Sequence, residues 1–321
     1  MNRPEKPADP DPPLSTSAVL LTLLTVILWG GLPTAVRFST EVIPPVAVAG
    51  LRFAMAAAFT AMWAIIQGTP LLLPPKQLLR PLVGGILLFA QIALFTVGIH
   101  LSNASHGSVV VNTFVFWVVA IEHFLPGTAR LHRRQISGLL LAAISVGMIL
   151  LTIPDAAQPA TEAPSFEGDL MLVISALILA VKILFTQASV HQLHPDQFVT
   201  WHAVFGTVFF AVWSLLTEDF PATQLTLLHD AQVRNAVLAV AYQGVIVAGF
   251  CFALQARLLQ LYSASRVSVF SFATPLFGIL FAVILRGDDL SPWLFVSGAG
   301  VAAGIALVNQ GSSGPAGRKE Q

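Results

Sequence analysis

Long apolar runs separated by short polar stretches set the organisation of the chain. The clearest case is the stretch from Leu261 to Val308, in which two runs of about 20 apolar residues are joined by one short acidic turn. A helix of that length spans roughly 30 Å, the thickness of the hydrocarbon core of a bilayer. Because backbone polar groups in lipid must bond within their own segment, runs of this length predict membrane-spanning helices.

The same pattern along the whole chain predicts an all-α integral membrane protein with about ten transmembrane helices. In the first half the predicted helices are Ala18–Val36, Pro45–Ile66, Leu82–Leu101, Ser108–Leu125 and Ile136–Ile153. In the second half they are Leu170–Val190, Gln197–Leu216, Ala236–Leu258, Ser265–Leu285 and Pro292–Val308.

The second half of the chain repeats the first. The segment Ser102–Ser105 aligns with Tyr262–Ser265 at an offset of 160 residues, and Pro45–Trp63 aligns with Pro195–Trp213 at an offset of 150. Each half carries five predicted helices. Because five is odd, the second half must enter the membrane in the opposite orientation, which predicts two inverted five-helix repeats.

This repeat divides the chain into two structural units with polar ends. The N-terminal residues 1–17 hold several prolines and predict a disordered cytoplasmic tail. The first repeat covers 18–153 and the second covers 169–309, with a breaker-rich linker loop at 154–168. Residues 310–321 form a second cytoplasmic tail.

Composition agrees with a lipid environment and excludes several classes of protein. Hydrophobic residues make up 55% of the chain and charged residues 10%, against about 25% charged in soluble domains, and the mean hydropathy is +0.79. The net charge of +0 gives no basic footprint for nucleic acid. A single cysteine, Cys251, excludes disulfides and cysteine-based metal sites.

Basic residues predict how the chain lies in the membrane. With the amino terminus inside, eleven basic residues fall on the cytoplasmic side and three, Arg37, Arg234 and Arg286, on the other. This asymmetry places both termini in the cytoplasm. The eleven are Arg3, Lys6, Lys76, Arg80, Arg130, Arg133, Arg134, Arg257, Arg266, Arg318 and Lys319.

Two basic residues lie within predicted spans and are the first candidates for a binding site. Arg52 falls in the outer third of the second helix and Lys182 near the middle of the sixth. A basic group at a helix centre costs about 2.5–3.5 kcal/mol, so such residues usually face a cavity or a partner. Both are candidates to bind an anionic group. The alternatives are a tie to backbone carbonyls or snorkelling for Arg52, and a tolerated neutral lysine for Lys182.

Other polar residues within the spans extend this set. His202 occupies the repeat-equivalent position of Arg52, which favours a hydrogen-bonded packing histidine, with coupling to protons as the functional alternative. The amides of Gln91, Asn112 and Gln243 are expected either to bind substrate or to bond between helices.

Helix breakers mark two places where the spans could bend. The segment Trp29-Gly30-Gly31-Leu32-Pro33 interrupts the first helix, and Ala273-Thr274-Pro275 interrupts the ninth. Breaks free backbone groups that must be satisfied by a cavity or a neighbouring helix. We therefore assign Trp29 and Gly30 to the binding site and Pro33 and Pro275 to gating, with simple packing kinks as the alternative.

Several chemical motifs are absent from the sequence. It contains no phosphate-binding loop of the G-x-x-x-x-G-K-[ST] type, no H-E-x-x-H zinc motif and no G-x-S-x-G nucleophile motif. We therefore expect no catalytic residues, no metal and no cofactor.

The duplicated helices and their motifs resemble the drug/metabolite transporter superfamily, of the EamA type. The resemblance rests on Trp29-Gly30, on Pro45 with Arg52, and on Ala264 followed by Pro275-Leu276-Phe277, then an acidic turn and Gly298. It implies a secondary carrier in the cytoplasmic membrane that often exports metabolites or amino acids, with a cavity lined by helices one to four and six to nine. One departure is Val115 at the position equivalent to Pro275, which predicts a straighter fourth helix than ninth.

The sequence thus predicts a transporter that works by alternating access on small molecules bearing an anionic group, first of all amino acids and related metabolites. Its predicted partners are the substrate and the lipid bilayer of the inner membrane, as a monomer or homodimer. A non-transporting membrane sensor or scaffold remains the alternative.

Overall fold

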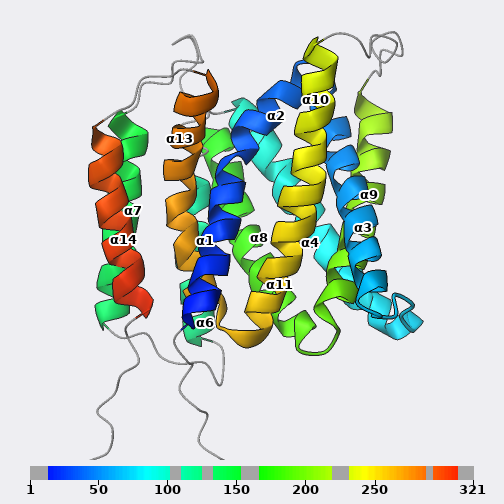
Figure 1. Ribbon diagram of the computed structural model, residues 1–321, viewed down its shortest axis with the longest axis horizontal. Coiled ribbons are helices and arrows are strands. Elements are labelled where there is room, and N and C mark those ends of the chain that lie inside the picture. Colours follow the sequence, from blue (N-terminus) through cyan, green and yellow to red (C-terminus); the bar gives the residue numbers. More distant parts are fainter. Residues whose placement is uncertain are drawn as a thin grey trace, which may run out of the picture.

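The computed structural model describes residues 14–101, 110–124, 133–152, 166–218, 231–286 and 292–309, and these residues form helices and short connections without any strand (Figure 1). The predicted N-terminal and C-terminal tails and the predicted linker lie mostly outside this part of the chain. Where they overlap it, helix begins at Thr16 and at Phe166, two to three residues before the predicted repeats.

The helices of the first half are α1 (Thr16–Gly30), α2 (Leu32–Thr40), α3 (Pro45–Ile66), α4 (Pro75–Leu101), α6 (Phe114–Phe124) and α7 (Arg133–Thr152). Those of the second half are α8 (Phe166–Val190), α9 (Pro195–Thr217), α10 (Ala231–Ala241), the π-helix η2 (Tyr242–Cys251), α11 (Phe252–Leu261), α12 (Ala264–Ser268), the 3₁₀-helix η3 (Val269–Ala273), α13 (Thr274–Arg286) and α14 (Trp293–Asn309). Helix α3 has the predicted bounds.

Seven helical stretches in the described part of the chain are long and apolar enough to cross a membrane. Two further apolar helices, Val110–Phe124 and Phe295–Val308, are shorter. Leucine and phenylalanine side chains on the outside of the bundle remain exposed, among them Leu215 at 84% and Phe124 at 84%. An apolar exterior on this scale suits a protein surrounded by lipid, and the protein is a multi-pass membrane protein.

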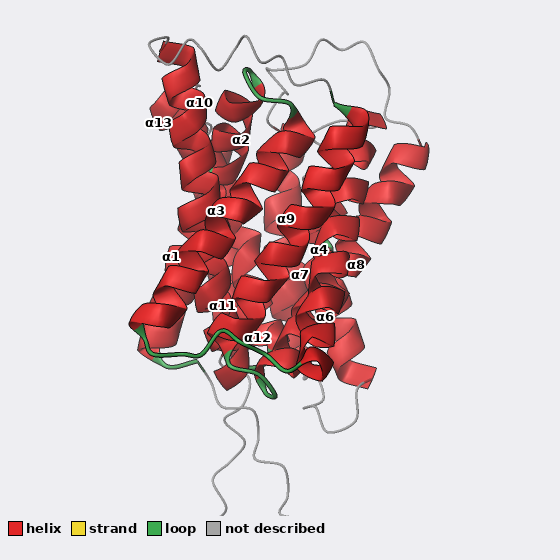
Figure 2. Ribbon diagram, turned by 90° about the vertical axis from the view of Figure 1, so that its right-hand side faces the viewer, coloured by secondary structure: helices red, strands yellow, loops and turns green. Residues whose placement is uncertain are grey.

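The helices pack as a bundle in which segments far apart in the sequence lie side by side. Helix α3 packs along α9, α7 along α14, and α4 against both α8 and α9, while α1 packs against α13. Helix α1 begins and α14 ends at the same end of the bundle, the lower end in Figure 1, which we call the terminal face. The described loops 67–74, 191–194 and 262–263 lie at this face (Figure 2). The other end is the opposite face.

The two predicted breaks meet inside the bundle. The first span divides at Gly31, and the carbonyl of Leu28 just before it accepts a hydrogen bond from the hydroxyl of Tyr242 at 2.5 Å. A methyl group at Gly30 would lie 2.6 Å from Cβ of Phe277, two residues after Pro275, so only glycine permits this close approach. The first and ninth helices therefore touch where each is interrupted.

The fourth helix contains a break among its described residues, and whether it is straighter than the ninth, as Val115 predicts, stays a prediction. It turns at Thr113, where the Oγ1 and N of Thr113 both donate to the carbonyl of Val110, at 2.6 and 3.0 Å. In the repeat, Thr113 corresponds to Ala273, the last residue of η3. A threonine side chain that bonds its own backbone can interrupt a helix without proline.

Candidate functional site

Phe252, the first residue of α11, is the centre of a cluster formed by four other helices. Its ring centroid lies 6.3 Å from that of Trp29 on α1, 6.4 Å from Phe53 on α3 and 6.3 Å from His202 on α9. The Nζ of Lys182 on α8 lies 5.5 Å from the same centroid. The structure thus brings three of the predicted site residues, Trp29, Lys182 and His202, around one aromatic ring.

Lys182 is buried, and among the described residues its hydrogen-bond partner comes from the facing helix α4. Its side chain is 8% exposed, and Nζ donates to Oε1 of Gln91 at 3.3 Å. Gln91 is held in turn by Ser175, whose hydroxyl donates to the backbone carbonyl of Gln91 at 2.8 Å. One neutral acceptor leaves donor capacity on an ammonium group with three N–H bonds, so Lys182 can bind a further acceptor.

Arg52 lies beside this cluster on α3. Its guanidinium carbon stands 4.7 Å from the ring centroid of Phe53, which lies 6.4 Å from that of Phe252. The buried Nε of Arg52 has no hydrogen-bond partner among the described residues. An arginine whose N–H groups are not all satisfied at membrane depth is suited to receive an anion.

His202 is buried between aromatic rings. It stacks on Phe198 with a centroid distance of 5.7 Å and an interplanar angle of 19°, and its Nε2 has no hydrogen-bond partner among the described residues. Small residues on α4 make this arrangement possible, since a side chain at Gly84 would lie 2.9 Å from the Phe198 ring and 3.2 Å from His202. His202 therefore faces both α4 and the Phe252 ring.

The charges of this cluster are not balanced within the described part of the chain. No described carboxylate forms an ion pair with Arg52 or Lys182, and the carboxylates that are buried lie at the ends of the bundle. Asp196, at the start of α9, forms a two-oxygen ion pair with Arg257 at 3.0 and 3.1 Å. The middle of the bundle is therefore basic and lined by aromatic rings.

Three of the predicted binding residues lie outside the cluster, namely Gln243, Gly30 and Asn112. Gln243 is fully buried in η2 and donates from Nε2 to the carbonyl of Ala35 at 3.2 Å and to Oγ of Ser39 at 2.9 Å. Gln243 therefore joins the π-helix to α2, as expected for the alternative in which its amide bonds between helices. Gly30, as described above, makes a helix contact and not a polar site.

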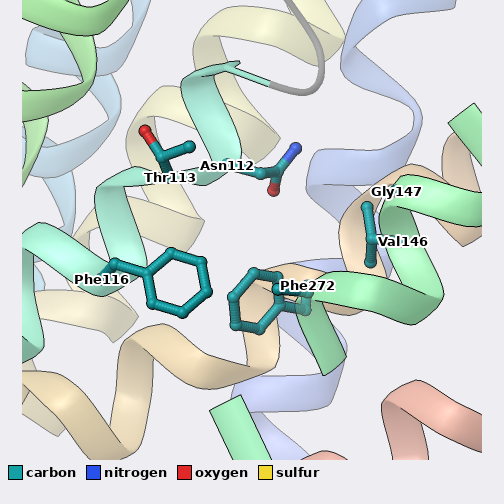
Figure 3. Close-up of a pocket in the computed structure, with 7 residues that line it drawn as sticks. Asn112, Thr113, Phe116, Val146, Gly147 and Phe272 are labelled. Atoms are coloured by element: carbon teal, nitrogen blue, oxygen red, sulfur yellow. The ribbon is translucent and has the colours of Figure 1, made fainter. Parts of the chain in front are cut away.

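Asn112 lines a separate small cavity, of about 90 Å³ (Figure 3). Its neighbours there include Thr113, the rings of Phe116 and Phe272, and the backbone of Gly147. None of the residues around Phe252 lines this cavity. The predicted gating prolines lie in the first turns of α2 and α13, where proline is compatible with a helix.

The residues that sequence reasoning missed are mainly aromatic. Phe252, Phe53 and Phe198 are three of 22 phenylalanines in apolar runs, and nothing in the pattern distinguishes them. No sequence motif or charge pattern marks Ser175 as a site residue either. No group of three His, Cys, Asp or Glu side chains that could hold a metal ion occurs among the described residues.

The described helices form an apolar bundle with a basic centre lined by aromatic rings, an arrangement suited to carrying a polar solute across a membrane. The chain belongs to the EamA-like transporter family, whose sequence profile matches residues 16–151 and 166–310. The two matched segments cover both halves of the chain.

Similar proteins carry transporter names. A probable amino-acid metabolite efflux pump of Escherichia coli (strain K12) is 27% identical over 90% of this chain and 93% of that protein. An uncharacterized transporter of Bacillus subtilis (strain 168), YoaV, is 22% identical over 90% of this chain and 96% of its own length. One solved crystal structure, 20% identical, matches with a TM-score of 0.75 over 91% of this chain and 97% of that chain, which shows a shared fold.

Proposed function

We propose that the protein exports small metabolites that carry an anionic group, such as amino acids and related compounds, across the bacterial inner membrane. The substrate binds beside Phe252, where Lys182 and Arg52 supply positive charge and Trp29 and Phe53 supply apolar walls. The single observation that carries the substrate class is the basic centre without an ion-paired carboxylate in the described residues. The name of the Escherichia coli relative supports amino-acid metabolites and the outward direction.

We further propose that the chain forms ten spans as two inverted five-helix repeats, with the terminal face in the cytoplasm. The basic residues of the predicted loops support this orientation. The packing also supports the repeat, because two of the five pairs of repeat-equivalent helices pack side by side, α3 with α9 and α7 with α14. Reporter fusions at Gln321 test the orientation, and activity there of a reporter that works only outside the cytoplasm would overturn it.

Alternating access is proposed to use the two breaks that meet between the first and ninth helices. Pro33 and Pro275 each lie in the first turn after a break, so the helix on one side can move relative to the other. Pro275→Ala is expected to lower the transport rate per folded molecule with little loss of extracted protein. Lost yield at an unchanged rate per folded molecule would assign Pro275 to packing instead.

The experiment that tests the function is a flux screen in proteoliposomes against mixtures of amino acids and other carboxylate metabolites, with and without a pH gradient. We expect uptake of anionic or zwitterionic compounds into these vesicles and no uptake into protein-free vesicles. Dependence on the pH gradient would identify proton coupling, for which His202 is the candidate. Absence of flux for every compound would favour the non-transporting sensor or scaffold. Cross-linking in the same vesicles distinguishes a monomer from a homodimer.

A further inference from the structure

Two carboxylates, one at each face of the bundle, accept hydrogen bonds from backbone N–H groups in the other half of the chain. At the terminal face, Glu122 on α6 accepts hydrogen bonds from the backbone N atoms of Ala264 and Ser265, at 2.9 and 3.0 Å. At the opposite face, Glu218, directly after α9, accepts from the N atoms of Val46 and Ala47, both at 2.8 Å. In each case both oxygens of one carboxylate are used.

The helices that receive these carboxylates have no cap from their own sequence. Helix α3 follows Pro44, which has no side-chain acceptor, and the hydroxyl of Ser263 makes no capping bond to α12. The first N–H groups of a helix have no intrahelical acceptor, and the positive end of the helix dipole favours an anion there. Glu122 and Glu218 therefore cap α12 and α3 from the other half of the chain, because they supply the acceptors that local side chains do not.

Neither glutamate has a carboxylate at the equivalent position of the other repeat. The position equivalent to Glu122 at the offset of 160 residues is Ala282, and the position equivalent to Glu218 at the offset of 150 is Gly68. Each contact therefore occurs at one face only. The first half contributes the carboxylate at the terminal face, and the second half contributes the carboxylate at the opposite face.

We propose that Glu122 and Glu218 are gating residues of the transport cycle, Glu122 holding the terminal face closed and Glu218 the opposite face. This inference rests on the alternating-access function proposed above, in which one face opens at a time. When a face opens, the helix of one half moves away from the carboxylate of the other half. The freed N–H donors then need a new acceptor, because a buried unpaired donor is costly. Water that enters the open face supplies it.

A purely structural cap would stabilise the folded protein without changing the balance between conformations. The test therefore measures that balance directly. Pairs of nitroxide labels are attached to cysteines at His123 and Leu261 for the terminal face, and at Glu41 and Thr217 for the opposite face, all exposed positions. The background is Cys251→Ala, and distances are measured by pulsed electron spin resonance in liposomes without substrate.

Glu122→Gln is expected to increase the population of long distances between the terminal-face labels by roughly tenfold, since charge-assisted hydrogen bonds are lost, and to leave the opposite-face pair unchanged. Glu218→Gln is expected to increase the population of long distances between the opposite-face labels and to leave the terminal-face pair unchanged. The matched controls Lys76→Gln and Glu167→Gln, which remove exposed charges at the two faces, should change neither distribution.

Unchanged distances in both glutamine variants, or equal changes at both faces in each variant, would overturn the proposal. If a glutamine variant does not fold, Glu122→Asp or Glu218→Asp keeps the charge but shortens its reach, and the same face should shift in the same direction. No shift in the folded aspartate variants also overturns it. Because no substrate is present, these outcomes are independent of which compound is transported.

Discussion

The middle of the bundle and its two faces use charge in opposite ways. In the middle, Arg52 and Lys182 lie beside aromatic rings, without an ion-paired carboxylate among the described residues. At the faces, the carboxylates of Asp196, Glu122 and Glu218 each have strong partners. A basic group in mid-membrane is costly to bury, which is why we propose that the anionic group of the substrate is its partner. The paired charges at the faces instead hold helix ends together.

The largest expected effect on stability lies at the terminal face. Asp196→Ala leaves Arg257 without its ion-pair partner, and the aspartate side chain is 1% exposed. We expect the free energy of unfolding to fall by about 2–3 kcal/mol, below the loss for a fully buried pair because the Arg257 side chain is 36% exposed. Chemical unfolding in detergent measures the change. Glu167→Ala at an exposed position is the control, and an equal loss in both variants would contradict the comparison.

Two buried glutamines sharpen the same contrast. Gln243→Leu removes two hydrogen bonds between η2 and α2, so the free energy of unfolding should fall by about 1–2 kcal/mol with substrate affinity preserved. Gln91→Leu removes the acceptor of Lys182, so it should alter substrate affinity in the proteoliposome assay. The same pattern of losses in both variants would mean that Gln91 is also only a structural tie.

A smaller effect is expected at the aromatic centre. Phe252→Leu keeps an apolar side chain but removes the ring beside Lys182, so substrate affinity should fall by about 1 kcal/mol, close to fivefold. Competition for flux in proteoliposomes measures the affinity. The exposed Phe124→Leu is the matched control. If Phe252→Leu transports with native affinity, the ring is a packing residue.

The spans were the most predictable part of the molecule. The apolar run Pro45–Ile66 ends in breakers on both sides, and the structure gives α3 those bounds. The interruption at Gly31 was also visible, because glycine and proline stand together there. Hydropathy reports these features directly, since each depends on residues that are adjacent in the sequence.

The contacts of the site were less predictable because they join distant segments. Depth and charge singled out Lys182 and His202, but not the phenylalanine between them, since an aromatic residue in an apolar run carries no distinct signal. No pattern in the sequence of η2 predicts a π-helix either. Glu122 and Glu218 bond backbone N–H groups 142 to 172 residues away, and any residue type can supply such a donor. Composition cannot identify a partner of that kind.

The most direct test of a basic substrate site is Lys182→Met, assayed with a carboxylate substrate without an amino group, found in the flux screen, and with its neutral methyl ester. Removing the charge should weaken binding of the carboxylate by about 1–3 kcal/mol and change binding of the ester little, because the ester does not use the charge. Folded yield should match that of the exposed control Arg37→Met, since a lone basic group in mid-membrane carries a desolvation cost. Equal losses for the two ligands, or a large fall in folded yield, would make Lys182 a structural partner and contradict the anionic substrate.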